Sequence, residues 1–342
     1  MALPRLLRAA SLSLLATCSG GSSSDPPMKT PQPTTPTTKP APLGPFRTLK
    51  GGGGGALAGG AASAPVLSLH VTGATWWTGD TATTISFDHL GFVGGSVWID
   101  DGKRLRVGLG TIDLASKAFA IEPALQSFAS STKRLGGVAW FPDGTRVALL
   151  LNAPALRVDQ RPPPGYDPSK RELVIVSLAG TEPPARRPIT VEGTAVIAAG
   201  DDRVIVSGRS TQMFDARAEP VAVSFTSLPD GVARASFNAG RFVLVGSDGT
   251  ITLLDARSGT IVATWGQTGI ADAVVTGNTI VAVDREATVH VGCLAGGKVS
   301  EVAKASVGSV GIFVQIVGDH VVVEADGPDP VRVAALASPC QP

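Results

Sequence analysis

A turn motif that returns at a nearly constant interval constrains this chain more than any other feature. Each turn joins two β-type runs, and taking positions 102, 144, 202, 240, 278 and 319 as equivalent gives spacings of 42, 58, 38, 38 and 41 residues. Asp-Gly and Gly-Asn pairs at these turns tolerate the positive φ that two-residue hairpins need. Six hairpins at this spacing predict a repeat architecture.

The run after each turn is almost continuously apolar, as in Val204-Ile205-Val206 and in residues 242–245. Such strands are buried on both faces, since a strand with one wet face would alternate apolar and polar residues. Helical spacing of apolar residues is absent. The pattern therefore predicts an all-β domain over residues 66–342, built of blades packed face to face as in a β-propeller.

Two local motifs carry a family resemblance. Residues 247–259 read SDGTITLLDARSG, which resembles the repeats of WD-repeat and quinoprotein-like propellers, with Asp255 in the place of the WD aspartate. Residues 138–146 are similar to a turn in the propeller of periplasmic translocation proteins. The resemblance implies a fold rather than a ligand. The spacing from Gly259 to Trp265 is longer than in the quinoprotein docking motif, so no cofactor is expected.

Six blades are expected, with seven as the alternative if residues 76–90 build a degenerate extra blade. The final unit, residues 331–336, is followed by too little sequence for a fourth strand, whereas the β-run 65–71 has no blade of its own. An N-terminal strand is therefore expected to complete the last blade and remove an exposed sheet edge. Residues 83–87 are the competing candidate for that strand.

Residues 1–17 have the features of a signal peptide. Arg5 and Arg8 precede an apolar stretch over residues 9–17 that is too short to span a bilayer. The following Leu15-Ala16-Thr17-Cys18 resembles the lipobox of bacterial lipoproteins, which implies an acylated Cys18 and a lipid-anchored protein of the cell envelope, at the outer membrane or cell surface. The alternative is an ordinary cleaved signal with an incidental Cys.

Residues 18–65 are expected to be a disordered linker after the lipidated Cys18. Nine of the 26 prolines fall between residues 19 and 65, together with Thr-Pro and Gly runs. Too few apolar side chains are present to offset the entropy of ordering such a segment. It would act as a tether between a membrane and the propeller.

Two further cysteines remain once Cys18 is assigned to acylation. Cys293 and Cys340 form an even pair in an oxidising compartment, so a disulfide is expected, with two free thiols as the alternative.

Signals for catalysis are scarce, and the sequence favours a non-catalytic protein over an enzyme. The net charge of +1 argues against nucleic acid as a partner. The four histidines are isolated from one another, so no metal site is expected. The acidic pairs Asp100-Asp101 and Asp201-Asp202 lie in tight turns, where Asp is favoured for backbone reasons. Asp215 and Asp255 are likewise interpreted as turn-bracing residues.

The loops between second and third strands hold the candidate partner-binding groups, because loops on a rigid scaffold carry binding residues. One of them is a long insertion over residues 152–172. The alternative is a set of solvated turns without function. The candidates are Arg157, Arg161, Tyr166, Arg209, Asp248, Asp284, Arg285, Glu286, Glu324 and Asp326.

The leading functional hypothesis is a membrane-anchored scaffold or recognition module for envelope proteins. One alternative is a secreted propeller hydrolase or lyase acting on a carbohydrate or lactone in the central channel. Another is a sensor of a small ligand. Inner strands such as Ala195-Val196-Ile197-Ala198 and Ala273-Val274-Val275 favour the non-catalytic protein, since an enzyme needs convergent acid and base groups there.

Overall fold

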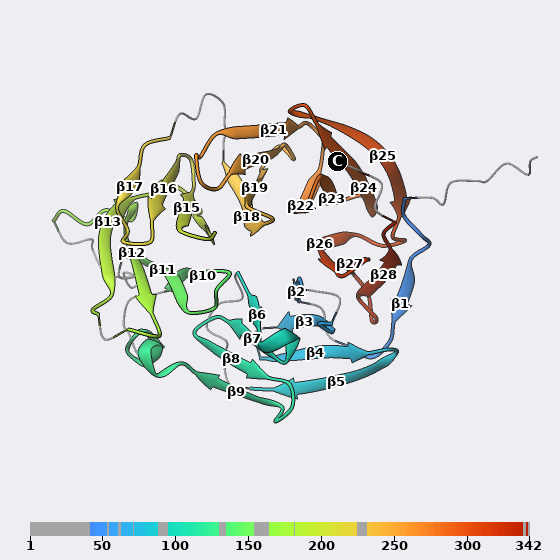
Figure 1. The fold of residues 1–342 in the computed structure, drawn as a ribbon, viewed down its shortest axis with the longest axis horizontal. Coiled ribbons are helices and arrows are strands. Elements are labelled where there is room, and N and C mark those ends of the chain that lie inside the picture. The colour runs from blue at the N-terminus through green and yellow to red at the C-terminus, as the bar shows by residue number, and fades with distance from the viewer. Residues whose placement is uncertain are drawn as a thin grey trace, which may run out of the picture. The chain divides into compact units, whose positions relative to one another are not determined.

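The structure, a computed structural model, describes residues 42–52, 55–60, 63–70, 72–87, 95–129, 135–153, 164–180, 182–223, 231–337 and 340. Within the unit formed by residues 40–342, the strands form seven four-stranded antiparallel sheets that follow one another around a ring (Figure 1). The domain is a seven-bladed β-propeller, and the expectation of an all-β propeller is confirmed.

The first four blades follow the chain in order from the innermost to the outermost strand (Figure 1). Blade 1 is β2 (Ala56–Ala58), β3 (Val66–His70), β4 (Gly73–Thr78) and β5 (Thr81–Ser86). Blade 2 is β6 (Val97–Ile99), β7 (Arg104–Val107), β8 (Gly110–Asp113) and β9 (Ala118–Ile121). Blade 3 is β10 (Leu135–Trp140), β11 (Arg146–Asn152), β12 (Lys170–Ser177) and β13 (Ala185–Thr190). Blade 4 is β14 (Val196–Ala199), β15 (Arg203–Ser207), β16 (Thr211–Asp215) and β17 (Pro220–Val221).

The remaining blades continue this order except at the last strand. Blade 5 is β18 (Val232–Asn238), β19 (Arg241–Gly246), β20 (Ile251–Asp255) and β21 (Ile261–Trp265). Blade 6 is β22 (Ile270–Thr276), β23 (Thr279–Asp284), β24 (Thr288–Ala295) and β25 (Lys298–Ser306). Blade 7 is β26 (Gly311–Val317), β27 (His320–Ala325), β28 (Val331–Ala335) and then β1 (Arg47–Leu49). Short helical turns, η1 (Asp100–Gly102), η2 (Pro123–Leu125) and α1 (Gln126–Ala129), occur between strands.

The hydrophobic core lies between the blades. In the described residues, seven clusters of buried side chains each join one pair of neighbouring blades, including the pair of blades 7 and 1. In β27, Val321 and Val323 pack toward blade 6 while Val322 packs toward blade 1. Second strands such as β23 and β27 thus bury both faces, and this is why their sequences are apolar at consecutive positions.

The prediction of six blades is wrong, and its alternative of seven is right. Blade 1 escaped detection because a longer connection, residues 59–65, joins β2 to β3 in place of an Asp-Gly turn. Its strand β4 does carry the tryptophan pair that suggested an extra blade. Trp76 packs toward blade 2 and Trp77 toward blade 7, each almost fully buried.

An N-terminal strand completes the last blade, but it is a different segment from either candidate. Residues 66–70 form β3 and residues 81–86 form β5, both within blade 1. The closing strand is β1, in which Arg47, Thr48 and Leu49 pair antiparallel with Val333, Arg332 and Val331 of β28. Both β1 and β2 come from the segment expected to be linker. Runs of only three residues do not indicate a strand by themselves, and β1 and β2 owe their strand conformation to pairing with blades 7 and 1 respectively.

Backbone hydrogen bonds also join blades 7 and 1 at the inner edge of the ring. The Gly60 amide donates to Ile316 O at 3.3 Å, and the Gly318 amide donates to Gly60 O at 3.1 Å. At the outer edge, Leu43 and Leu336 form an antiparallel bridge beside β1. The seam where the two ends of the ring meet is therefore bonded on both sides.

Cys293 of β24 and Cys340 are joined by a disulfide, with a Cα–Cα distance of 5.4 Å. Cys340 lies beyond β28, so the bond links blade 6 to the segment that follows blade 7. Cys18 and the expected signal peptide lie outside the described residues. Among the helices of the described part of the chain, none has the length and apolar character needed to cross a bilayer.

The closing role of β1 predicts a strong effect of Leu49→Ala. Leu49 is 2% exposed and belongs to the core between blades 7 and 1, so its truncation should lower the free energy of unfolding by about 2–4 kcal/mol in a urea titration. Thr48→Ala on the exposed side of the same strand is the matched control and should change it by less than about 0.5 kcal/mol. Equal midpoints for the two variants would contradict closure through β1.

Candidate functional site

One end of the propeller carries the turns between second and third strands, and we call it the loop face. A backbone hydrogen bond recurs there in blades 4 to 7, from the turn to the link that precedes the blade. The four bonds are Arg209 N to Glu192 O at 3.0 Å, Ser247 N to Gly231 O at 2.9 Å, Arg285 N to Gly269 O at 3.0 Å and Asp326 N to Val310 O at 2.9 Å. The predicted loop residues of these blades thus occupy equivalent places on one face.

Aspartate side chains brace the loop-face turns from within. Asp248 Oδ1 accepts a hydrogen bond of 2.9 Å from the Thr250 amide. Asp284 Oδ1 accepts bonds from the amides of Glu286 and Thr288, at 2.9 and 2.8 Å. These bonds fix the turn backbone, as Asx turns do.

The candidate residues differ in what they present to solvent. Arg209, Asp248, Arg285, Glu286 and Asp326 are exposed, and Tyr166 is half-buried. Arg157 and Arg161 lie outside the described residues.

Two candidates are not surface groups. Glu324 and Asp284 are only 6% and 8% exposed, because they belong to the strands β27 and β23 rather than to the turns beyond those strands. The expectation that their side chains lie on an exposed loop is therefore corrected.

His290 connects Asp284 to the outer strand of blade 6. Its Nε2 lies 3.0 Å from Asp284 Oδ2 and its Nδ1 lies 2.7 Å from Glu301 Oε2. The histidine therefore has a hydrogen-bond partner at each ring nitrogen. This arrangement ties β23, β24 and β25 together beneath the loop face.

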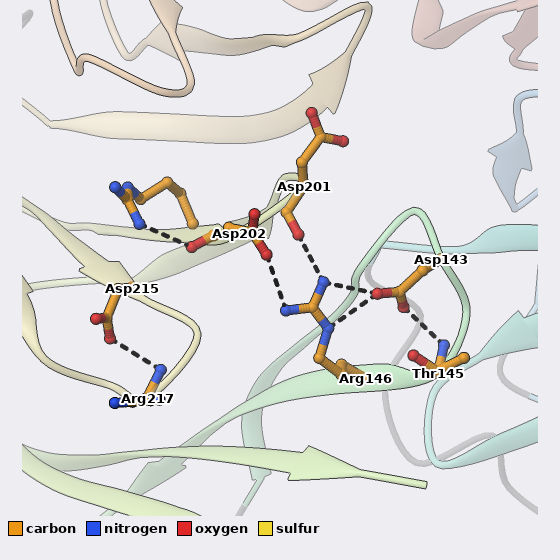
Figure 2. Close-up of polar contacts among 8 residues, drawn as sticks. Asp143, Thr145, Arg146, Asp201, Asp202, Asp215 and Arg217 are labelled. Atoms are coloured by element: carbon orange, nitrogen blue, oxygen red, sulfur yellow. Dashed lines mark hydrogen bonds and ion pairs between the residues drawn. The ribbon is translucent and has the colours of Figure 1, made fainter. Parts of the chain in front are cut away.

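The opposite end of the propeller is held by arginines that begin the second strands. Figure 2 shows Arg146 of blade 3 donating to Asp143 Oδ2 of its own turn at 2.6 Å and to Asp202 Oδ1 of blade 4 at 3.2 Å. Arg146 also donates to the carbonyl oxygen of Asp201 at 2.7 Å. Arg241 of blade 5 makes the corresponding bond to Gly277 O of blade 6. These side chains link neighbouring blades by hydrogen bonds.

The same contacts explain the acidic residues that the sequence placed in turns. The Asp201-Asp202 pair is engaged by Arg146, and the Asp215 carboxylate accepts the Arg217 amide at 2.8 Å (Figure 2). Asp255 accepts the Ser258 amide at 2.7 Å, and this hydrogen bond lowers the pKa of the Asp255 carboxyl. Asp215 and Asp255 thus brace their own turns, whereas Asp202 through its carboxylate and Asp201 through its carbonyl oxygen bind an arginine of the neighbouring blade.

A channel of about 850 Å³ runs along the axis and is lined by inner strands of all seven blades. Its two walls differ in chemistry. Blades 1 to 4 contribute mostly small or apolar side chains, among them Ala56, Val97, Ala139 and Ile197, with Ser96 and the turn residue Asp201 as polar members. Blades 5 to 7 contribute the polar groups Arg234, Ser236, Asn238, Asp272, Thr276 and Gln315.

Three side chains occupy equivalent positions at the loop-face end of this channel. Arg234, Asp272 and Phe313 each follow a bulge in the inner strand of blades 5, 6 and 7 and pair with Val245, Val283 and Glu324 respectively. The Arg234 guanidinium carbon lies 4.4 Å from the centre of the Phe313 ring. The amide of Val314 donates to Asp272 Oδ2 at 3.0 Å. A cation, an aromatic ring and a carboxylate are thus gathered at one mouth of the channel.

Two carboxyl groups near this mouth, those of Asp272 and Glu324, have raised pKa values. Burial raises the pKa of Asp272 to about 6, against the opposing effects of the Val314 amide bond and the Arg234 charge. Burial also raises the pKa of Glu324 to about 7, opposed by a hydrogen bond from the Gly55 amide and by Arg234, and assisted by the charge of Asp326. Glu324 Oε2 is buried and has no hydrogen-bond partner in the described structure.

The sequence interpretation missed Arg234 and Asp272. Each is a single charged residue within an inner-strand run of apolar and small residues, Val232-Ala233-Arg234-Ala235 and Ile270-Ala271-Asp272-Ala273. That interruption is the signal that would have marked them as channel residues. An apolar stretch marks a strand as buried but does not tell which of its residues face the axis.

Comparison with known proteins bears on the fold. No family model and no curated protein matches the chain. Among solved structures, U3-55K aligns with 11% identity over 85% of this chain and 98% of its own, with a TM-score of 0.63. The WD40 repeats of RRP9 align with 12% identity over 85% and 97%, at a TM-score of 0.63. The fold is that of the WD40 propellers.

A third match extends the same conclusion. The Cps50 (Swd1) β-propeller domain of Myceliophteria thermophila shares 11% identity over 85% of this chain and 98% of its own, with a TM-score of 0.58. At these identities the similarity to WD40 propellers establishes architecture and leaves the ligand to be argued from this chain's own residues.

The raised pKa values predict how stability depends on pH. Between about pH 4 and pH 7 the folded chain retains protons on Asp272 and Glu324 that the unfolded chain has lost, so the free energy of unfolding should fall as pH rises through this range. Asp272→Asn, which keeps an acceptor for the Val314 amide, should flatten that decline. Urea titrations at half-unit pH intervals measure it, and an unchanged slope in the variant would contradict the assignment to Asp272.

Proposed function

We propose that this chain is an exported lipoprotein, held at a membrane of the bacterial envelope by an acylated Cys18, whose loop face recognises a protein partner without catalysis. One structural observation supports the recognition role. In blades 4 to 7 the loop-face turns are fixed by equivalent backbone bonds, while the side chains of Arg209, Arg285, Glu286 and Asp326 remain exposed.

A braced turn with an exposed charged side chain is suited to recognition. Because the turn backbone is already ordered, this chain loses less conformational entropy when a partner binds than it would with mobile loops. The exposed groups carry both signs of charge, and mixed charge selects a complementary partner surface more than it adds bulk affinity. This supports a protein partner over a polyanion, in agreement with the net charge of +1.

The alternative of a hydrolase or lyase acting in the channel has less support. Acid-base catalysis of that kind uses two groups that both reach the substrate. Asp272 lines the channel, whereas Glu324 is not among the described lining residues and lies in the second strand. The channel is therefore interpreted as a binding cavity, and the proposed recognition function does not depend on it.

Charge reversal on the loop face tests the recognition role. The double variant Arg209→Glu, Arg285→Glu should abolish capture of the wild-type set of proteins from envelope extracts, because it inverts two exposed charges of the proposed surface. Thermal unfolding should be nearly unchanged, since both residues are exposed and the Arg209–Glu192 pair at 3.7 Å is solvent-screened.

Lys103→Glu, an exposed residue at the opposite end of the propeller, is the matched control and should capture the same proteins as the wild type. Retention of the full wild-type set by the double variant would exclude this face as the binding surface.

The lipid anchor has a separate test. Cys18→Ser should abolish incorporation of a labelled fatty acid and move the exported chain from the membrane fraction to the soluble fraction, because each buried methylene contributes about 0.8 kcal/mol to membrane attachment. Equal labelling of the variant and the wild type would refute acylation at Cys18. Cys293→Ser serves as a cysteine control that should remain labelled.

A further inference from the structure

The axial channel has two unlike walls, and this asymmetry indicates the kind of ligand it suits. Polar groups from β18, β22 and β26 follow one side, while small and apolar groups from β2, β6, β10 and β14 follow the other. A cavity of about 850 Å³ falls within the range of small-molecule sites. A ligand that is polar along one edge and apolar along the other would satisfy both walls.

Arg234 supplies a positive group at this mouth. Its guanidinium lies over the Phe313 ring at 4.4 Å, and its charge acts on the nearby carboxyl groups of Asp272 and Glu324. Stacking on an aromatic face restrains the planar guanidinium while its N–H donors in the plane stay available. Such a group binds a carboxylate through two parallel hydrogen bonds.

Asp272 supplies the opposite charge on the adjacent blade. Its side chain is 8% exposed, lines the channel, and is held by the Val314 amide at 3.0 Å. Val314 follows Phe313, so the acidic group is anchored to the same strand that carries the aromatic ring beneath Arg234. A buried carboxylate is stabilised when a cationic partner with hydrogen-bond donors replaces the lost water.

We infer that the channel mouth binds a free α-amino acid with an apolar side chain. The ligand carboxylate pairs with Arg234, its ammonium pairs with Asp272, and its side chain packs along the apolar wall of blades 1 to 4. A zwitterion meets both charged groups at once, whereas a simple anion would be repelled by Asp272 and a simple cation by Arg234. This site is independent of the loop-face charges of the proposed function.

Isothermal titration calorimetry of the detergent-purified full chain tests the site. L-leucine, L-valine and L-phenylalanine are the probes, and at least one should give a saturable isotherm at pH 7.5. Arg234→Gln and Asp272→Asn should each weaken binding of that amino acid by about ten- to a hundredfold, as expected for loss of a charged hydrogen bond. Arg209→Gln is the matched control on the loop face and should bind as the wild type does.

Ligands that lack one charge locate the contacts. Leucinamide has no carboxylate, so it should bind the wild type weakly and should not lose affinity in Arg234→Gln, which removes the charge that repels it. N-acetyl-leucine has no ammonium and should likewise not lose affinity in Asp272→Asn. L-aspartate should bind more weakly than the apolar amino acids, because its second carboxylate would face the apolar wall.

Three results would overturn the inference: no saturable binding of any of the three apolar amino acids, an unchanged affinity in Arg234→Gln, or aspartate binding as tight as that of leucine. If Asp272→Asn fails to fold, Arg234→Gln and the leucinamide titration still decide. Loss of amino-acid binding with intact protein capture would separate this site from the proposed recognition face.

Discussion

The antiparallel pairing of β1 with β28 is the contact on which the rest of the structure depends. Every blade has two apolar faces, so each core exists only if the blade has a neighbour on both sides. Without closure, blade 7 would expose Val322 and Val331, and blade 1 would expose Leu57 and Trp77, all of which now share one cluster. A three-residue strand thereby permits the burial of two whole sheet faces, and every blade of the closed ring has a neighbour on both sides.

The two ends of the closed propeller and the channel between them differ in how their side chains are engaged. At one end, Arg146 and Arg241 bind the turns of the next blade, so these side chains hold neighbouring blades together. At the loop face the backbone performs that bracing, which leaves side chains such as Arg285 exposed. Between the two ends, the strands of four blades line the channel mainly with small and apolar side chains, and those of the other three add polar groups. The contacts that hold the blades together, the proposed recognition face and the proposed ligand site thus lie in separate regions of the propeller.

The sequence predicted the features that local chemistry determines. Tight turns and apolar runs such as 242–245 indicate hairpins buried on both faces, and they were enough to predict a β-propeller.

Blade 1 was missed because β2 lies in a glycine-rich segment and owes its strand conformation to Val66–His70 beside it. Asp272 and Arg234 were missed because convergence on an axis depends on which strands are innermost, a long-range property. Glu324 was predicted to lie in a loop, but β27 continues through it and the turn begins only after Ala325. Whether the exposed loop residues bind a partner stays a prediction.

The position of β1 gives the domain a mechanical weak point. Pro42, Leu43 and Gly44 bond in succession to Ala337, Leu336 and Ala335, ahead of the three ladder pairs of β1. Tension applied to the chain before Pro42 would load these bonds one after another along the pair of β1 and β28. The first element to detach would be the strand that closes the ring. A pull on the N-terminus is thus converted into opening at the seam of blades 7 and 1, while the disulfide from Cys293 to Cys340 keeps blade 6 fastened to the chain beyond blade 7.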